Sequence, residues 1–235
     1  MRDVINAIEE EKRYVADRMN GANTSLAQRL SAYGYTNLSD YFSDKKNYLF
    51  SKWIPEIRYV DIAEVSQAVE KAIAEKDYGV YIPVVDGLYA YHGTDDIDHE
   101  LCKNLNVRVV DMNYVGGTII GSSDDFSIEI LLPNDIGITA NEIITKIASI
   151  ISTHINGVSI DGNDILINGE KVLGSMTRRI NGVFVWAAQA TFGNYVKEIE
   201  KICNKKSIKK PSRINSEKLT KRSLENEVIA WLRKQ

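Results

Sequence analysis

Residues 161–179 read Asp-Gly-Asn-Asp-Ile-Leu-Ile-Asn-Gly-Glu-Lys-Val-Leu-Gly-Ser-Met-Thr-Arg-Arg. Residues 165–167 form a β-rich run, and the Asn168-Gly169 pair that follows them favours a type I′ turn. An apolar pattern resumes in residues 171–173 and stops at Gly174. This stretch therefore predicts a β-hairpin made of two short strands.

The predicted hairpin would hold Lys171 rigidly, because its strand starts at a tight turn. Asn163 and Asp164 stand just before the first strand. An ordinary hairpin with a solvated lysine is also consistent with the pattern, since Asn-Gly turns are common. Hairpin geometry alone therefore leaves the role of Lys171 open.

The composition indicates a globular chain without a membrane or secretion signal. Its 235 residues are 44% hydrophobic and 26% charged, enough for a substantial core. No apolar run is long enough to span a bilayer, and the first residues are charged. Two cysteines without a Cys-x-x-Cys pattern and three scattered histidines give no zinc motif. We expect a cytoplasmic protein that does not bind a membrane.

Charge is distributed unevenly along the chain. Residues 201–235 carry 11 Lys and Arg against 3 Glu, whereas the whole chain has a net charge of −3, so residues 1–200 carry −11. A basic edge beside a site could steer an acidic partner toward it. Nucleic acid is not an expected partner, because the basic segment contains a single aromatic residue, Trp231, and the acidic body would repel phosphate.

Residues 1–55 predict a helical N-terminal extension. Residues 2–19 have helical apolar spacing, Thr24 or Ser25 can cap a second helix, and Ser39-Asp40 can cap a third, short one. We expect the aromatic residues of this region to form a packing face for the neighbouring domain. They are Tyr33, Tyr35, Tyr41, Phe42, Tyr48, Phe50 and Trp53.

Residues 56–235 predict one α/β (α+β) domain, a mixed β-sheet flanked by helices. The pattern alternates between β-rich runs and stretches of helical spacing. The expected strands are 57–62, 78–85, 87–93, 107–111, 126–132, 158–160, 165–167, 171–173 and 182–191. The expected helices are 63–76, 95–104, 139–156, 195–203 and 216–235.

The segment from Gly162-Asn163-Asp164 through Lys171 to Gly174-Ser175 resembles the adenylate-binding segment of the lipoate-protein ligase family. This family belongs to the wider biotin/lipoate ligase and octanoyltransferase superfamily. The resemblance extends over about residues 57–235, and Ser212-Arg213-Ile214 is similar to the closing phrase of the family. It implies the biotin/lipoate ligase type of fold.

Three motifs of the family are altered in this chain. Asp111-Met112 stand where the family has paired arginines, and Gly121-Ser122 stand in place of a histidine and an acid. Between them the glycine-rich loop keeps Gly116 and Gly117, whose backbone amides would line an acyl channel. Trp186-Ala187-Ala188 stand where the family's strand usually carries histidine, glycine and threonine.

The resemblance implies that ATP activates a carboxylic acid, lipoate or a related acyl group, which then passes to a lysine of a carrier. Lys171 would stabilise the negative charge that develops in both steps. Asn163 would bind the nucleotide or acyl phosphate, and Asp164 would hold Mg²⁺ or orient Lys171. Gly174 would belong to the nucleotide site, and Arg178 or Arg179 could replace the missing arginines. The partner would be a small acidic carrier similar to a lipoyl domain.

Two further hypotheses belong to other classes of function. One is a cysteine-dependent octanoyl or lipoyl transferase with Cys203 as its nucleophile, which would need an accessible thiolate near Lys171. The other is a catalytically inert relative that binds a ligand or a protein, as the altered motifs would allow. The lysine-rich sequence that follows Cys203, where the transferases have glycine, favours instead a cysteine that packs under the expected helix 195–202.

Overall fold

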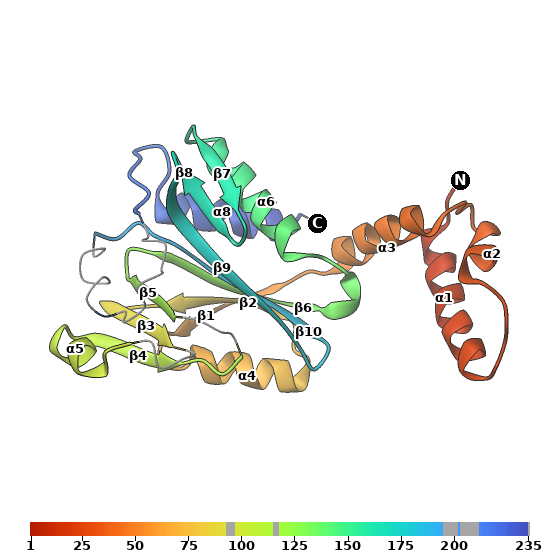
Figure 1. Cartoon of the computed structure of the whole chain (residues 1–235), viewed down its shortest axis with the longest axis horizontal. Helices are drawn as coiled ribbons and strands as arrows, with labels where there is room; N and C mark the ends of the chain where they lie inside the picture. Colours follow the sequence, from red (N-terminus) through yellow and green to blue (C-terminus); the bar gives the residue numbers. More distant parts are fainter. Residues whose placement is uncertain (93–96, 115–117, 195–201, 203–211, 235) are drawn as a thin grey trace. The chain divides into compact units, whose positions relative to one another are not determined.

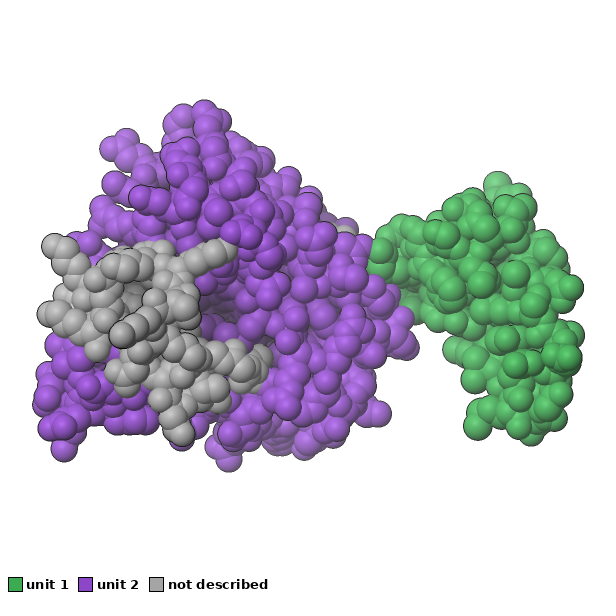
Figure 2. Space-filling view, viewed as in Figure 1, with its two compact units in different colours: residues 1–54, 235 green, residues 55–234 purple. Residues whose placement is uncertain are grey.

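The computed structural model describes residues 1–92, 97–114, 118–194, 202 and 212–234. The chain is divided into two compact units, Met1–Ile54 and Pro55–Lys234 (Figure 2). The division falls at the proline that ends the expected helical extension.

The first unit consists of helices α1 (Val4–Met19), α2 (Leu26–Ser31) and α3 (Leu38–Lys52). Ser25 caps α2, as the sequence predicted, and its side chain accepts a hydrogen bond from the Gln28 backbone. The third helix was expected to be short and capped by Ser39-Asp40, which is wrong. It has 15 residues and begins after Asn37, whose side chain accepts from the backbone of Asp40.

The first unit has a hydrophobic core of its own, formed by Ala7, Ile8, Leu30, Tyr35 and Tyr41. The rings of Tyr35 and Tyr41 meet edge to face with centroids 5.3 Å apart. The Tyr41 hydroxyl donates to the carboxylate of Glu11 at 2.7 Å. For these two tyrosines, the expectation of a packing face for another domain is wrong, because they are buried inside the unit.

All the described strands lie in the second unit, and Figure 1 shows their arrangement. The strands are β1 (Glu56–Asp61), β2 (Gly79–Val84), β3 (Leu88–His92), β4 (Val107–Asp111), β5 (Thr118–Ser122), β6 (Phe126–Pro133), β7 (Val158–Asp161), β8 (Asp164–Ile167), β9 (Glu170–Ile180) and β10 (Val183–Ala190). The helices of this unit are α4 (Val65–Glu75), α5 (His99–Asn104), α6 (Ala140–Ser152) and α8 (Lys221–Leu232), with a 3₁₀ turn at Asn134–Ile136.

The described strands form two sheets, whereas the sequence predicted one. Seven strands pair in the order β1-β2-β6-β10-β9-β8-β7, and three pair in the order β4-β3-β5. Both sheets are mixed, since β1 is parallel to β2 and β3 is parallel to β4. Residues 118–121 were expected to belong to a loop, but they lie in β5, which pairs antiparallel with β3. The predicted class, a mixed sheet flanked by helices, is confirmed.

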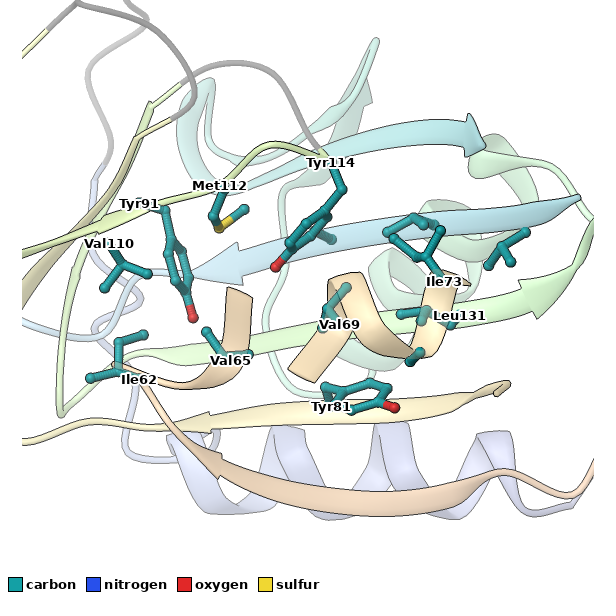
Figure 3. Packing of buried hydrophobic residues seen from close by; sticks show 14 of the residues in the cluster. Ile62, Val65, Val69, Ile73, Tyr81, Tyr91, Val110, Met112, Tyr114 and Leu131 are labelled. Atoms are coloured by element: carbon teal, nitrogen blue, oxygen red, sulfur yellow. The ribbon is translucent and has the colours of Figure 1, made fainter. Parts of the chain in front are cut away.

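The large sheet is covered on both faces. Helix α4 and the small sheet share one hydrophobic cluster with β6 and β10, to which Leu131, Val183 and Val185 contribute (Figure 3). Helices α6 and α8 contact the strands β6 to β9 and each other (Figure 1). Burial on both faces explains why every residue of β10 is buried. Within the described residues, no helix has the length and apolar character needed to cross a membrane.

Candidate functional site

The hairpin that the sequence predicted is present as β8 and β9. Asn168 and Gly169 have φ values of 52° and 85°, which a type I′ turn requires. The second strand was expected to stop at Gly174, and this is wrong, because β9 continues through Gly174 to Ile180. It then returns as β10 after a second turn at Asn181-Gly182, again with positive φ at both residues. The long strand joins the hairpin to the centre of the large sheet.

Lys171 lies across Gly174 and pairs with Asp164. Its Nζ is 2.9 Å from the Oδ1 of Asp164, and the two side chains are only 24% and 16% exposed. A Cβ added at Gly174 would come within 2.9 Å of both Cε and Nζ of Lys171. A residue without a side chain at position 174 therefore lets the lysine lie flat on the sheet, and Asp164 fixes its ammonium group. Asp164 was expected either to hold Mg²⁺ or to orient Lys171, and both roles stay predictions beside this ion pair.

A row of residues crosses four strands beneath this ammonium group. Gly174 is in register with Asp164 on β8 and with Gln189 on β10, and Gln189 is in register with Ser127 on β6. Residues directly opposite each other in antiparallel strands share a face of the sheet. Lys171 therefore lies on the face of the large sheet that carries Gln189 and Ser127, which is the face turned toward the small sheet.

Hydrogen bonds fix the two ends of the hairpin. The backbone N–H and the hydroxyl of Ser175 both donate to the carbonyl of Asn163, each at 2.9 Å. Ser212 donates its backbone N–H to the carbonyl of Lys171 and its hydroxyl to Glu170. The closing phrase identified in the sequence thus lies along the strand of Lys171. The side chain of Asn163 is exposed, and its expected contact with a nucleotide stays a prediction.

The two arginines of β9 face opposite sides of the sheet, as expected for neighbours in a strand. Arg178 shares the face of Gly174 by alternation and donates to the backbone carbonyl of Asn113 at 2.9 Å. Arg179 donates to Asn134 and lies over the ring of Phe184. Of the two candidates, only Arg178 is on the face of Lys171.

Three of the expected site residues, Gly116, Gly117 and Cys203, lie outside the described residues. The channel and nucleophile roles given to them therefore stay predictions. The described cysteine, Cys102, is buried, and burial raises the pKa of its thiol. A raised pKa disfavours the thiolate, so Cys102 is not suited to be a nucleophile.

Glu129 is a site residue that the sequence reasoning missed. It is 2% exposed, and its Oε1 accepts a hydrogen bond from the Tyr114 hydroxyl at 3.1 Å. Burial raises the pKa of this carboxyl to about 8, so it is mostly protonated at neutral pH. An acidic residue inside the run Phe-Ser-Ile-Glu-Ile-Leu-Leu was the available signal.

A small cavity lies beside Glu129, between the two sheets. Its volume is about 10 Å³, the space of one water molecule. Figure 3 shows Tyr91, Met112 and Tyr114 side by side among the buried residues of this region. The apolar lining includes Pro83, Met112, Ile119 and Ala187, and the polar lining includes Tyr91, Ser127, Glu129 and Gln189.

The altered motifs contribute to this interior. Met112, which stands in place of an arginine, is buried and lines the cavity, as do Ala187 and Ala188. A Cβ added at Gly121 would come within 2.5 Å of the ring and hydroxyl of Tyr89. Tyr89 thus fills the space that a side chain at position 121 would need. The Tyr89 hydroxyl also donates to Gln189. The glycine at position 121 therefore leaves room for the tyrosine that makes this buried hydrogen bond.

Among the residues that the structure describes, no group of three His, Cys, Asp or Glu side chains is placed to hold a metal ion. Mg²⁺ in nucleotide sites is commonly held by one or two carboxylates together with phosphate oxygens. Asp164 supplies one such carboxylate, beside Lys171. The site residues are therefore compatible with a metal that arrives with a nucleotide.

Comparison with solved structures identifies the fold. LipL1 of P. falciparum, solved in complex with lipoate, matches with a TM-score of 0.62 at 16% identity, and the match covers 75% of this chain. It covers 60% of LipL1, so this chain spans less than two thirds of that protein. The bi-partite lipoate protein ligase of Thermoplasma acidophilum, studied with its E2 lipoyl domain, matches at 0.58 and 10% identity, covering 76% and 82% of the two chains.

A lipoate-protein ligase A bound with ATP matches with a TM-score of 0.56 at 13% identity, over 76% of this chain and 83% of the other. Biotin protein ligases share the fold, as the Leishmania major enzyme in complex with biotin shows at a TM-score of 0.52. No protein-family model matches the sequence, and no curated protein matches it either. The second unit therefore has the fold of lipoate and biotin protein ligases.

Proposed function

We propose that this chain is a divergent acyl ligase that activates a carboxylic acid with ATP and transfers the acyl group to a lysine of a small carrier protein. The observation that carries the proposal is the position of Lys171. Asp164 holds it over Gly174, on the face of the large sheet that is turned toward the small sheet. The fold shared with a ligase bound to ATP and with one bound to lipoate supports it.

In the first step of the proposed reaction, a carboxylate oxygen of the acid attacks the α-phosphorus of ATP, and pyrophosphate leaves. In the second step, the amine of the carrier lysine attacks the acyl carbonyl, and AMP leaves. Negative charge grows on the phosphate in the first step and on the carbonyl oxygen in the second. A fixed ammonium group next to both atoms lowers both barriers.

Lys171 is suited to this task by its surroundings. Its side chain is about three quarters buried, so an anion near Nζ is screened less by water than it would be on the surface. Asp164 and Gly174 limit the positions that the ammonium can take. A lysine held in this way loses little further freedom when a substrate binds.

Mg²⁺ would neutralise phosphate charge when ATP is bound, and Asp164 is the residue that we assign to it. Arg178, on the face of Lys171, is assigned to the phosphates in place of the family's paired arginines. The carrier is assigned by the charge of the chain, because the basic residues 201–235 suit an acidic partner such as a lipoyl domain. The ligase of Thermoplasma acidophilum was studied with such a domain.

Mass spectrometry of a lipoyl domain tests the proposal. The full chain is incubated with the domain, Mg²⁺, ATP and lipoate, or a medium-chain acid in place of lipoate. We expect one acyl group on the domain that requires ATP, disappears with Lys171→Ala and persists with Lys146→Ala, a surface lysine of α6. Acylation that does not require ATP, or that survives Lys171→Ala, would overturn it.

An inert binding protein is the second candidate, and the cavity lining favours it. The described residues that line the cavity include no arginine or lysine, and Met112 lines it where the resemblance would place an arginine. A chain of this kind would bind an acid without releasing pyrophosphate from ATP. The absence of pyrophosphate release with every acid tried, together with measurable binding of one of them, would select this candidate.

A further inference from the structure

Two buried polar atoms at the cavity have no hydrogen-bond partner among the described residues. They are the Oε2 of Glu129 and the hydroxyl of Tyr91, on side chains that are 2% and 3% exposed. Both residues line the cavity between the sheets. A buried polar group without a partner costs free energy, so such groups in native proteins generally have a ligand or a water beside them.

The cavity and Lys171 lie on the same face of the large sheet. Gln189 lines the cavity and is also the cross-strand neighbour of Gly174, over which the lysine lies. Ser127, a second lining residue, is two strands away from Gly174, which corresponds to roughly 10 Å at the usual spacing of strands. A medium-chain acid with its carboxylate at Lys171 could reach the cavity with its far end.

The far end of such an acid would have to match the cavity in size and chemistry. The cavity has room for a group the size of a water molecule. The carboxyl of Glu129 is mostly protonated at neutral pH, so that it can donate as well as accept, and a tyrosine hydroxyl has the same two capacities. A hydroxyl group satisfies both partners, whereas a methyl group satisfies neither.

We propose that the Glu129–Tyr91 cavity selects acids whose chain ends in a hydroxyl or a comparably small hydrogen-bonding group, in preference to acids that end in hydrocarbon. This inference rests on the proposed function, because it places the carboxylate of the acid at Lys171. It assigns Glu129 and Tyr91 a role in substrate selection that is separate from the chemistry at the lysine.

A matched pair of ligands tests the inference by binding. Octanoate and 7-hydroxyheptanoate have the same number of chain atoms and differ only in a terminal methyl or hydroxyl group. Isothermal titration of the full chain should show that the hydroxy acid binds about ten- to a hundredfold more tightly, since the alternative leaves buried polar groups unpaired. Tyr91→Phe and Glu129→Leu should each reduce this ratio to near one.

Two further variants serve as references. Tyr81→Phe removes a buried tyrosine hydroxyl that contacts Arg58 and does not line the cavity, so the ratio should be unchanged. Lys171→Ala should weaken both acids equally and keep the ratio. Circular dichroism checks that each variant is folded, and the conservative Tyr91→Phe keeps the test decisive if Glu129→Leu does not fold.

Equal binding of the two acids, or binding of neither, would overturn the inference and leave the cavity to a single water molecule. A preference for the hydroxy acid that survives Tyr91→Phe would overturn it as well. The proposed ligase function can be disproved independently of the selection site. If the hydroxy acid binds selectively but no acid supports pyrophosphate release, the selection site stands and the ligase activity does not.

Discussion

The hairpin at Lys171 and the buried cluster at Glu129 are built in opposite ways. Lys171, Asp164 and Gly174 come from eleven consecutive residues, and their contacts depend on one tight turn and one ion pair. The surroundings of Glu129 come from segments far apart in the sequence, β3, β6 and the chain that follows β4. The first site is local and partly exposed, whereas the second exists only when two sheets meet.

This difference has a consequence for function and stability. Side chains in the hairpin can be changed at modest cost to the fold, because the contacts that hold them are one ion pair and one tight turn. Changes at the cluster alter a closely packed interior, where added volume or an unpaired polar atom is expensive. Chemistry that depends on Lys171 should therefore be separable from folding, but selectivity that depends on Glu129 should not be fully separable.

The largest effect on stability is expected for Gly121→Ala, next to the cluster. The new Cβ would meet the ring of Tyr89 at 2.5 Å, and the ring is held by hydrogen bonds to Ser127 and Gln189. We expect a loss of about 3 kcal/mol in the free energy of unfolding, measured by urea denaturation. Adding Tyr89→Leu should restore part of it, and a fully additive double variant would show that the two residues do not compete for space.

The stability of the chain should depend on pH through the buried carboxyl of Glu129. The pKa of Glu129 is raised to about 8, above the value of an unfolded glutamate, so between these two values the native state binds the extra proton. Its contribution is complete at acidic pH and is lost as the pH rises toward 8. Between pH 6 and 7, Glu129→Gln should become more stable relative to wild type by about 1.4 kcal/mol in urea unfolding. Parallel profiles for the two proteins would contradict the raised pKa.

A smaller effect on stability is expected for Gly174→Ala in the hairpin. The added methyl would displace Cε and Nζ of Lys171, the flexible end of a side chain, so less than about 1 kcal/mol should be lost. Pyrophosphate release should nevertheless fall at least tenfold, because the ammonium moves away from the reacting atoms. Unchanged pyrophosphate release would show that the lysine need not lie flat on the sheet.

The sequence was informative where structure is determined locally. The Asn168-Gly169 turn and the strand at Val107–Asp111 were predicted from neighbouring residues, and the structure has both. Glycine was read as the end of a strand at Gly174, but β9 passes through it because Lys171 needs the free space. Whether a strand continues through such a glycine depends on its neighbours in the sheet, and the low β-propensity of glycine does not determine it.

The cluster could not be predicted for a related reason. In the run of β6, Ser127 and Glu129 alternate with apolar residues, a pattern typical of a strand with one face in water. The structure places the small sheet over that face, so both polar residues are buried. Recognising this required knowledge that residues 118–122 form a strand of a second sheet, which the two glycines just before them in the sequence, Gly116 and Gly117, concealed.

The central claim is that Lys171 stabilises the charge formed when the acid is activated. Acid-dependent exchange of labelled pyrophosphate into ATP, measured for wild type, Lys171→Ala and the surface control Lys146→Ala, tests it most directly. We predict a loss of about a hundredfold or more in Lys171→Ala and wild-type exchange in Lys146→Ala. Both variants should fold, with a change in unfolding free energy within about 0.5 kcal/mol for Lys146→Ala and of about 1 to 2 kcal/mol for Lys171→Ala, which leaves Asp164 without its partner. Exchange by Lys171→Ala at the wild-type rate would contradict the account.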